Sequence, residues 1–152
     1  MGILSRLLGP GHQPRDLLAD LAQDYRAEAE QAARLRQHAE RARYPQAAEA
    51  LRRLAEIEER HATWLRERLV MLGGRVPAVE GTPAPGNNQW ERAVAAQQAA
   101  QGKRRRLIEQ IGHWDPEEPE VVELLSRIEQ EDVRTQPVYD DLIMRSDPQS
   151  RD

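Results

Sequence analysis

One stretch decides the fold of this chain: Leu51-Arg-Arg-Leu-Ala-Glu-Ile-Glu-Glu-Arg-His-Ala-Thr-Trp-Leu-Arg-Glu-Arg-Leu-Val-Met-Leu72. Its leucines recur in steps of three and four residues, which places them on one face of an α-helix. Glu58 and His61 fall on the same face and interrupt the apolar stripe. A charged group in such a stripe costs free energy unless it is paired or bound to metal. This pair is therefore the best functional indication in the sequence.

A helix of the same kind precedes this stretch, and the two are predicted to form a hairpin. The first helix is expected to open at Pro14, because a missing N–H costs nothing in a first turn. Its seam of three- and four-residue steps contains one carboxylate, Glu28. Tyr44-Pro45 ends this helix and begins the next. A connection this short forces the two helices to run antiparallel.

The second helix is predicted to stop near Leu72, where Gly73-Gly74 gives a C-terminal cap signal. Residues 75–88 follow, rich in Pro and Gly and without periodicity. Such a segment is either a disordered linker or a crossover connection along the outside of a bundle. The second helix should be about 40 Å long, and the extended segment reaches about 50 Å. It is therefore long enough to return to the starting end, and we expect a crossover.

The second half is predicted to be another helical hairpin. Its first helix runs from after Asn88 to about Ile111, and its second follows Pro119 and carries Glu131 in its seam. The inward positions expected on the first of these helices are Trp90, Val94, Gln97 or Gln98, Gln101, Arg104 or Arg105, Ile108 and Ile111. Each hairpin therefore has a seam carboxylate on its second helix, with Arg134 standing where the first hairpin has His61.

Composition narrows the class of protein. Charged residues make up 32% of the chain, aromatic residues 4% and hydrophobic residues 39%, much of it Ala, which is typical of a helical bundle and not of a β-sandwich or barrel. The absence of cysteine excludes disulfides, Cys-ligated zinc, iron–sulfur clusters and thiol catalysis.

Charge argues against nucleic acid as a partner, because the net charge is −4 and nucleic-acid binding needs a concentrated positive face. The one basic run, Lys103-Arg-Arg-Arg106, is interpreted as a solvated or salt-bridged helix face. Lys103 is the only lysine, and we interpret this as a compositional bias.

The first residues, Met1-Gly-Ile-Leu-Ser-Arg-Leu-Leu-Gly9, are apolar but lack the length of a signal-peptide core. No apolar run is long enough to span a membrane, so a cytoplasmic protein is expected. The cluster Ile3, Leu4, Leu7 and Leu8 could dock on a partner or a membrane surface, or form a terminal turn. The expected organisation is an N-terminal apolar segment at 1–13, a bundle at 14–145 and a polar tail at 146–152.

A hairpin with Glu-x-x-His on its second helix, a long connection and a second hairpin resemble the ferritin-like superfamily. The stretch from Leu54 to Gly74 is most similar to its rubrerythrin branch. The resemblance implies an all-α, ferritin-like four-helix bundle of two antiparallel hairpins joined by a crossover loop. It also implies two irons held by one Glu from each of two helices and a Glu-x-x-His from each of the others.

Carried over residue by residue, the resemblance assigns four metal ligands. Glu28 matches the carboxylate of the first helix, Glu58 and His61 match the first Glu-x-x-His, and Glu131 matches the carboxylate of the second. The remaining two ligands are missing. Gln97, Gln98 and Gln101 occupy the region of the third-helix carboxylate, and Arg134 replaces the second His.

The missing ligands limit the metal that the chain could hold. Four carboxylates balance two divalent ions, whereas three carboxylates with an inward Arg134 suit one ion or none. We therefore expect at most one iron per chain, or a site built from two half-sites across the two-fold axis of a homodimer. The expected function is iron or peroxide handling at a reduced carboxylate–histidine site. The alternative is a metal-free bundle that serves as a scaffold or interaction protein, and whether the chain is an enzyme stays open.

Overall fold

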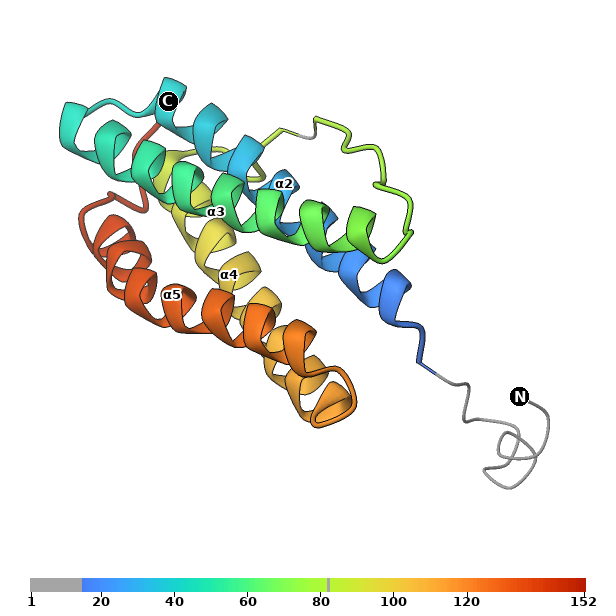
Figure 1. Cartoon of the computed structure of the whole chain (residues 1–152). Helices are drawn as coiled ribbons and strands as arrows, with labels where there is room; N and C mark the ends of the chain where they lie inside the picture. Colours follow the sequence, from blue (N-terminus) through green and yellow to red (C-terminus); the bar gives the residue numbers. More distant parts are fainter. Residues whose placement is uncertain (1–14, 82) are drawn as a thin grey trace, which may run out of the picture.

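The computed structural model describes residues 15–81 and 83–152, and these residues form four long helices and no strand (Figure 1). The helices are α2 at Leu17–Arg41, α3 at Pro45–Met71, α4 at Gln89–Trp114 and α5 at Pro119–Met144. The predicted all-α, four-helix architecture is confirmed. The apolar segment at 1–13 and Pro14 lie outside the described residues. Within the described part, no helix is both long and apolar enough to cross a membrane.

Local sequence signals set the helix ends. The Asp16 carboxylate caps α2 by accepting from the backbone N–H of Leu18 at 2.9 Å. Pro45 is the first residue of α3, as predicted. At the other end of α3, Gly73 adopts a φ of 81°, which lets the chain reverse so that the N–H of Gly74 donates to the Leu69 carbonyl at 2.8 Å.

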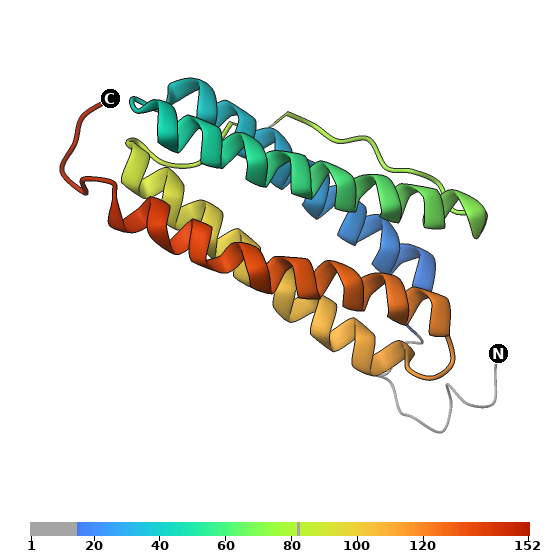
Figure 2. The ribbon, with the colours of Figure 1, turned by 60° about the vertical axis from the view of Figure 1, so that its left-hand side comes forward.

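The helices pack in pairs (Figures 1 and 2). Helix α2 packs along α3 and α4 packs along α5, and the two hairpins meet through contacts of α2 with α4 and of α3 with α5. The segment between α3 and α4 contacts the helices on both sides of residue 82. Val76 packs against an apolar cluster of the core, and the N–H of Ala84 donates to the Gln37 side chain on α2 at 3.1 Å.

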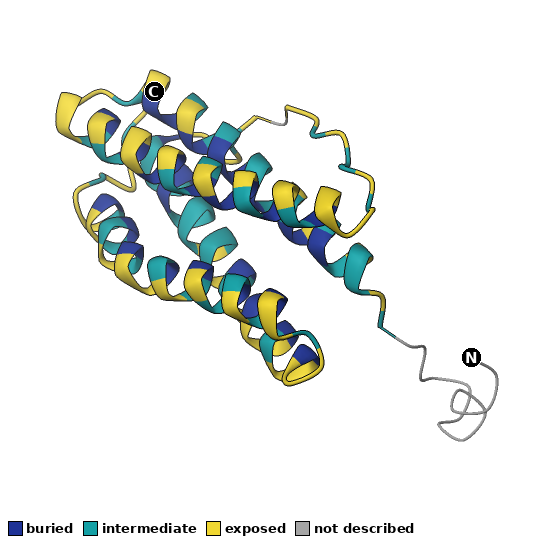
Figure 3. Ribbon diagram, in the orientation of Figure 1, coloured by how far each residue is buried: buried dark blue, intermediate teal, exposed yellow. Residues whose placement is uncertain are grey.

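The interior consists of two apolar clusters with a charged layer between them. Buried faces of all four helices turn inward (Figure 3). One cluster contains Leu35, Ala39, Leu51, Leu54, Ala55, Ala93, Tyr139 and Leu142. The other contains Leu21, Leu65, Leu69, Leu107, Val121, Leu125 and Ile128. Glu28 on α2, Glu58 and His61 on α3, Lys103 on α4 and Asp132 on α5 fall between the two sets along their helices, so this charged layer crosses the middle of the bundle. Buried Arg92 lies outside it, at the start of α4. Each fully buried leucine stabilises the fold by about 1.5–3 kcal/mol.

The buried faces of the second hairpin differ from the predicted seams. On α4 the buried residues are Arg92, Ala93, Lys103, Leu107, Gln110 and Trp114. The expected inward positions Gln101 and Ile108 are exposed. The error has a physical origin, because α4 is rich in Ala and Gln and its apolar residues do not favour one stripe. On α5 the buried face contains Asp132, while Glu131 is half-buried.

Candidate functional site

Three of the predicted site residues converge in the bundle interior. Glu28 comes from α2, and Glu58 and His61 come from α3 one helical turn apart. All three are almost fully buried. One possible ligand atom from each lies within 4.8 Å of those of the other two. The convergence that the ligand assignment requires is therefore present for these three residues.

A lysine completes the cluster from α4. The Lys103 ammonium donates to Glu28 Oε2 at 2.7 Å and also hydrogen-bonds Glu58 Oε2. Its side chain is only 6% exposed. The basic run was expected to be a solvated or salt-bridged helix face. Lys103 is salt-bridged, but in the interior and not on a surface face. The sequence did hold a signal, since this is the only lysine in a chain whose other basic residues are arginine or histidine.

Helix α5 supplies two carboxylates on the other side of the imidazole. His61 Nε2 lies 2.9 Å from Glu131 Oε2, and its Nδ1 lies 3.7 Å from Asp132 Oδ1. Asp132 is buried, whereas the Glu131 side chain is 22% exposed and also pairs with Arg60 at the surface. Glu131 therefore closes the cluster at its rim. Asp132 was not predicted, because the seam of this helix was expected to contain Glu131, one residue earlier.

Arg134 does not enter the cluster. The missing second imidazole suggested that Arg134 would point inward and neutralise the carboxylates, but it is exposed. The inward positive charge comes instead from Lys103 on the neighbouring helix. His38 is also buried on α2, while His113 is exposed. His12 lies outside the described residues.

The protonation states follow from burial and from these pairings. Burial alone would raise the pKa of Glu28, but the Lys103 ammonium and hydrogen bonds from its neighbours hold that pKa well below its usual range. Burial and the nearby Glu28 charge raise the pKa of Glu58 well above its usual range. One carboxyl of the pair is therefore ionised and the other keeps its proton, while Lys103 stays charged.

The surroundings of His61 favour its protonated form, whereas burial alone favours the neutral form of a histidine. Burial would lower the pKa of His61, but the carboxylates of Glu28, Asp132 and Glu131 raise it. Burial raises the pKa of Asp132 to about 6. The carboxylates of the cluster thus face two protein groups whose charged forms they favour, Lys103 and His61, and Asp132 ionises only as the pH rises through about 6.

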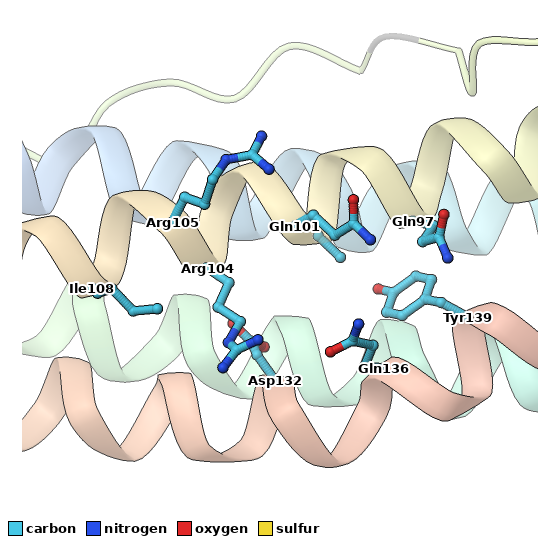
Figure 4. A pocket seen from close by; sticks show the side chains of 9 residues that line it. Gln97, Gln101, Arg104, Arg105, Ile108, Asp132, Gln136 and Tyr139 are labelled. Atoms are coloured by element: carbon cyan, nitrogen blue, oxygen red, sulfur yellow. The ribbon is translucent and has the colours of Figure 1, made fainter.

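A cavity of about 230 Å³ between α4 and α5 leads toward this cluster (Figure 4). Its walls carry Gln97, Gln101, Arg104, Arg105 and Gln136, and it reaches Asp132 and Tyr139. Of the three glutamines found in place of a ligand, Gln97 and Gln101 line this cavity and Gln98 is exposed, so none of them belongs to the cluster.

Comparison with protein family models found no match, and comparison with curated proteins found no match at the level required. Assignment of a function therefore depends on the geometry of the site.

Proposed function

We propose that this chain is a ferritin-like bundle in which a protein ammonium takes the place of the metal, and that it works as a metal-independent scaffold or interaction protein. The observation that carries the proposal is the position of Lys103 Nζ, within hydrogen-bonding distance of both Glu28 and Glu58. These two carboxylates and His61 are the residues that the family resemblance assigns to metal.

The donor set does not fit a divalent ion while Lys103 is charged. A divalent ion held by Glu28 and Glu58 would lie a few ångströms from the ammonium. At 4 Å and an effective dielectric constant near 20, their repulsion is about 8 kcal/mol, twice that of two unit charges. Release of the Lys103 proton would relieve this repulsion, but the two carboxylates raise the pKa of Lys103 far above its usual value.

The ferritin-like topology and the rubrerythrin relationship are part of the same proposal. The neighbouring helices support it, because α2 contacts both α3 and α4, and α5 contacts both α4 and α3. The connection at residues 72–88 touches α2 through Ala84, as a crossover along the bundle would. The cytoplasmic homodimer expected from the sequence stays a prediction.

A second candidate function is the one expected from the resemblance: a single iron at Glu28, Glu58 and His61, with Glu131 beside them, used for iron or peroxide handling. The observation that favours it is the 4.8 Å clustering of three buried ligand atoms. This candidate requires the Lys103 side chain to leave the two carboxylates.

Metal loading separates the two candidates. The purified protein is incubated anaerobically with ferrous iron, desalted and analysed for metal, together with Lys103→Met, the double variant Lys103→Met/His61→Ala, and Arg104→Met as a control. Arg104→Met also removes one positive charge from α4, but from a surface pair with Glu129. We expect background iron in the wild type and in Arg104→Met, about one ion per chain in Lys103→Met, and loss of that ion in the double variant.

Stoichiometric iron in the wild type would overturn the ammonium proposal. One iron per chain in the wild type, lost in the single variant His61→Ala made for this case, would then support the second candidate. Two irons per chain would contradict the charge argument for both candidates. Background iron in all four proteins would show that removal of Lys103 does not create a site, which would refute the idea that its ammonium stands where a metal would bind.

A further inference from the structure

Helix α2 ends, α3 and α4 begin and α5 ends at the same end of the bundle (Figure 1). A basic cavity lies among these helix ends. Its volume is about 480 Å³, within the range typical of small-ligand sites. Its charged lining residues are Arg41, Arg43, Arg145, Arg151, Asp147 and Asp152. Arg145 pairs with Asp141. In the described part of the chain, Arg41, Arg43 and Arg151 have no ion-pair partner, so the cavity carries an excess of positive charge.

A buried arginine lies next to this lining, on the far side of Asp152. The Arg92 side chain is 0% exposed, and its Nη1 forms an ion pair with Asp152 Oδ2 at 2.5 Å. In the described part of the chain, none of the three guanidinium nitrogens of Arg92 makes a well-aligned hydrogen bond. A buried guanidinium presents a fixed fork of donors that matches planar or tetrahedral oxyanions. Asp152 is 32% exposed, so it separates this buried cation from the cavity.

The surroundings of Asp152 favour an anion at this position. The direct contact with the Arg92 guanidinium lowers the pKa of Asp152 most, and the charges of Arg92 and Arg41 lower it further. Buried His38 lies close by and has an unpartnered Nε2. The cavity also contains the first residue of α4, Gln89, and the N-cap of α3, Tyr44, which makes no side-chain cap. Helix N-termini present free N–H groups to anions.

We propose that this cavity binds a small, multiply charged oxyanion of the phosphate class, and that the Asp152 carboxylate is the resident counter-ion with which the ligand competes. The ligand contacts Arg41, Arg43 and Arg151 at the walls and reaches Arg92 when Asp152 moves aside. This inference does not depend on the interior Lys103 cluster, which lies in the middle of the bundle.

Calorimetric titration with inorganic pyrophosphate, in a buffer free of phosphate and at near-physiological salt, tests the proposal. The proteins are the wild type, Asp152→Asn, Arg41→Ala/Arg43→Ala and a matched control, Arg66→Ala/Arg75→Ala. The control removes two exposed arginines from the opposite end of α3. All four substituted arginines are exposed, so neither double variant disturbs the core.

We expect pyrophosphate to bind the wild type, and the Arg41/Arg43 variant to bind about tenfold or more weakly, because charge-assisted hydrogen bonds are lost. The control should change less than about twofold. Asp152→Asn should bind several-fold more tightly, since it removes the competing carboxylate, and pyrophosphate should raise its Tm more than that of the wild type. Absence of binding to both wild type and Asp152→Asn would overturn the proposal. Equal weakening in the two double variants would also overturn it, by showing general charge attraction.

Discussion

Lys103 Nζ lies 2.7 Å from Glu28 Oε2, although the two residues are 75 positions apart and belong to different hairpins. The same ammonium contacts Glu58, so one side chain of α4 is held by one carboxylate of α2 and another of α3. The charge that neutralises the first hairpin thus comes from the second. This arrangement makes Lys103 the residue whose removal should affect the bundle most.

Replacement of Lys103 by Met should destabilise the fold by about 3–5 kcal/mol, because it leaves Glu28 and Glu58 buried without the ammonium that contacts both. Urea unfolding followed by circular dichroism at neutral pH, without added metal, measures the change. The surface variant Arg104→Met removes a pair whose Arg side chain is 38% exposed, and should cost less than about 1 kcal/mol. Equal free energies of unfolding for the two variants would show that buried Lys103 contributes no more to stability than a surface ion pair.

His61 should stabilise the fold in its charged form. Its pKa is raised by Glu28, Asp132 and Glu131 in spite of burial, so this contribution is fully present below the unfolded pKa and is lost as the pH rises through the folded one. His61→Gln should therefore lose more stability at about pH 6 than at about pH 9. Its helix content should be unchanged. A loss that is the same at both pH values would mean that the imidazole acts only by packing.

Asp24 should oppose folding at neutral and higher pH. It is buried, accepts from Gln110 Nε2 at 3.0 Å, and has one oxygen without a partner in the described residues. Burial raises its pKa from 3.8 to about 7. The folded state thus holds a proton that the unfolded state releases, and stability falls as the pH rises from about 4 to about 7.

Asp24→Asn removes this penalty, because an amide oxygen can still accept from Gln110. Relative to the wild type, the variant should gain on the order of a few kcal/mol in unfolding free energy between about pH 4 and about pH 8. Chemical denaturation at both pH values measures the gain. The idea fails if the wild type and Asp24→Asn differ by the same free energy of unfolding at both pH values.

His38 should remain neutral in mildly acidic solution. Burial, followed by the nearby Arg92 charge, lowers its pKa from 6.5 to about 4. Because charging of this buried imidazole opposes folding, the free energy of unfolding decreases as the pH falls from about 6.5 to about 4. An NMR titration of the imidazole resonances should give a midpoint near 4 for His38. Asp152→Asn should lower this midpoint further, since the Asp152 charge raises the pKa.

The sequence predicted the fold well where strong signals agreed. Pro45, the leucine stripe of α3 and Gly73 gave the bounds of that helix almost to the residue. The start of α2 was placed at Pro14, whereas the cap is Asp16. The faces of α4 could not be predicted, because alanines and glutamines fill one side as readily as another. Its buried face was decided by the helices that pack against it.

The site was predicted in its first half only. Glu28, Glu58 and His61 stand in stripes of large apolar residues, and such stripes make a charged interruption visible. Lys103 stands beside three arginines, so periodicity alone gave no reason to separate it from them. Asp132 follows Glu131 directly, and a helix seam cannot distinguish adjacent carboxylates without knowledge of the partner helix.

The charged layer between the two apolar clusters has a consequence for assembly of the chain. If any helix slid along its neighbours by one turn, about 5.4 Å, its ionic groups would face leucines and lose their partners, at a cost of several kcal/mol. The first hairpin alone would also carry Glu28 and Glu58 with no ammonium, and the second would carry Lys103 with no counter-ion from α2 or α3. The charged layer thus favours one register of the four helices over all others. It also makes each hairpin depend on the other for a stable folded state.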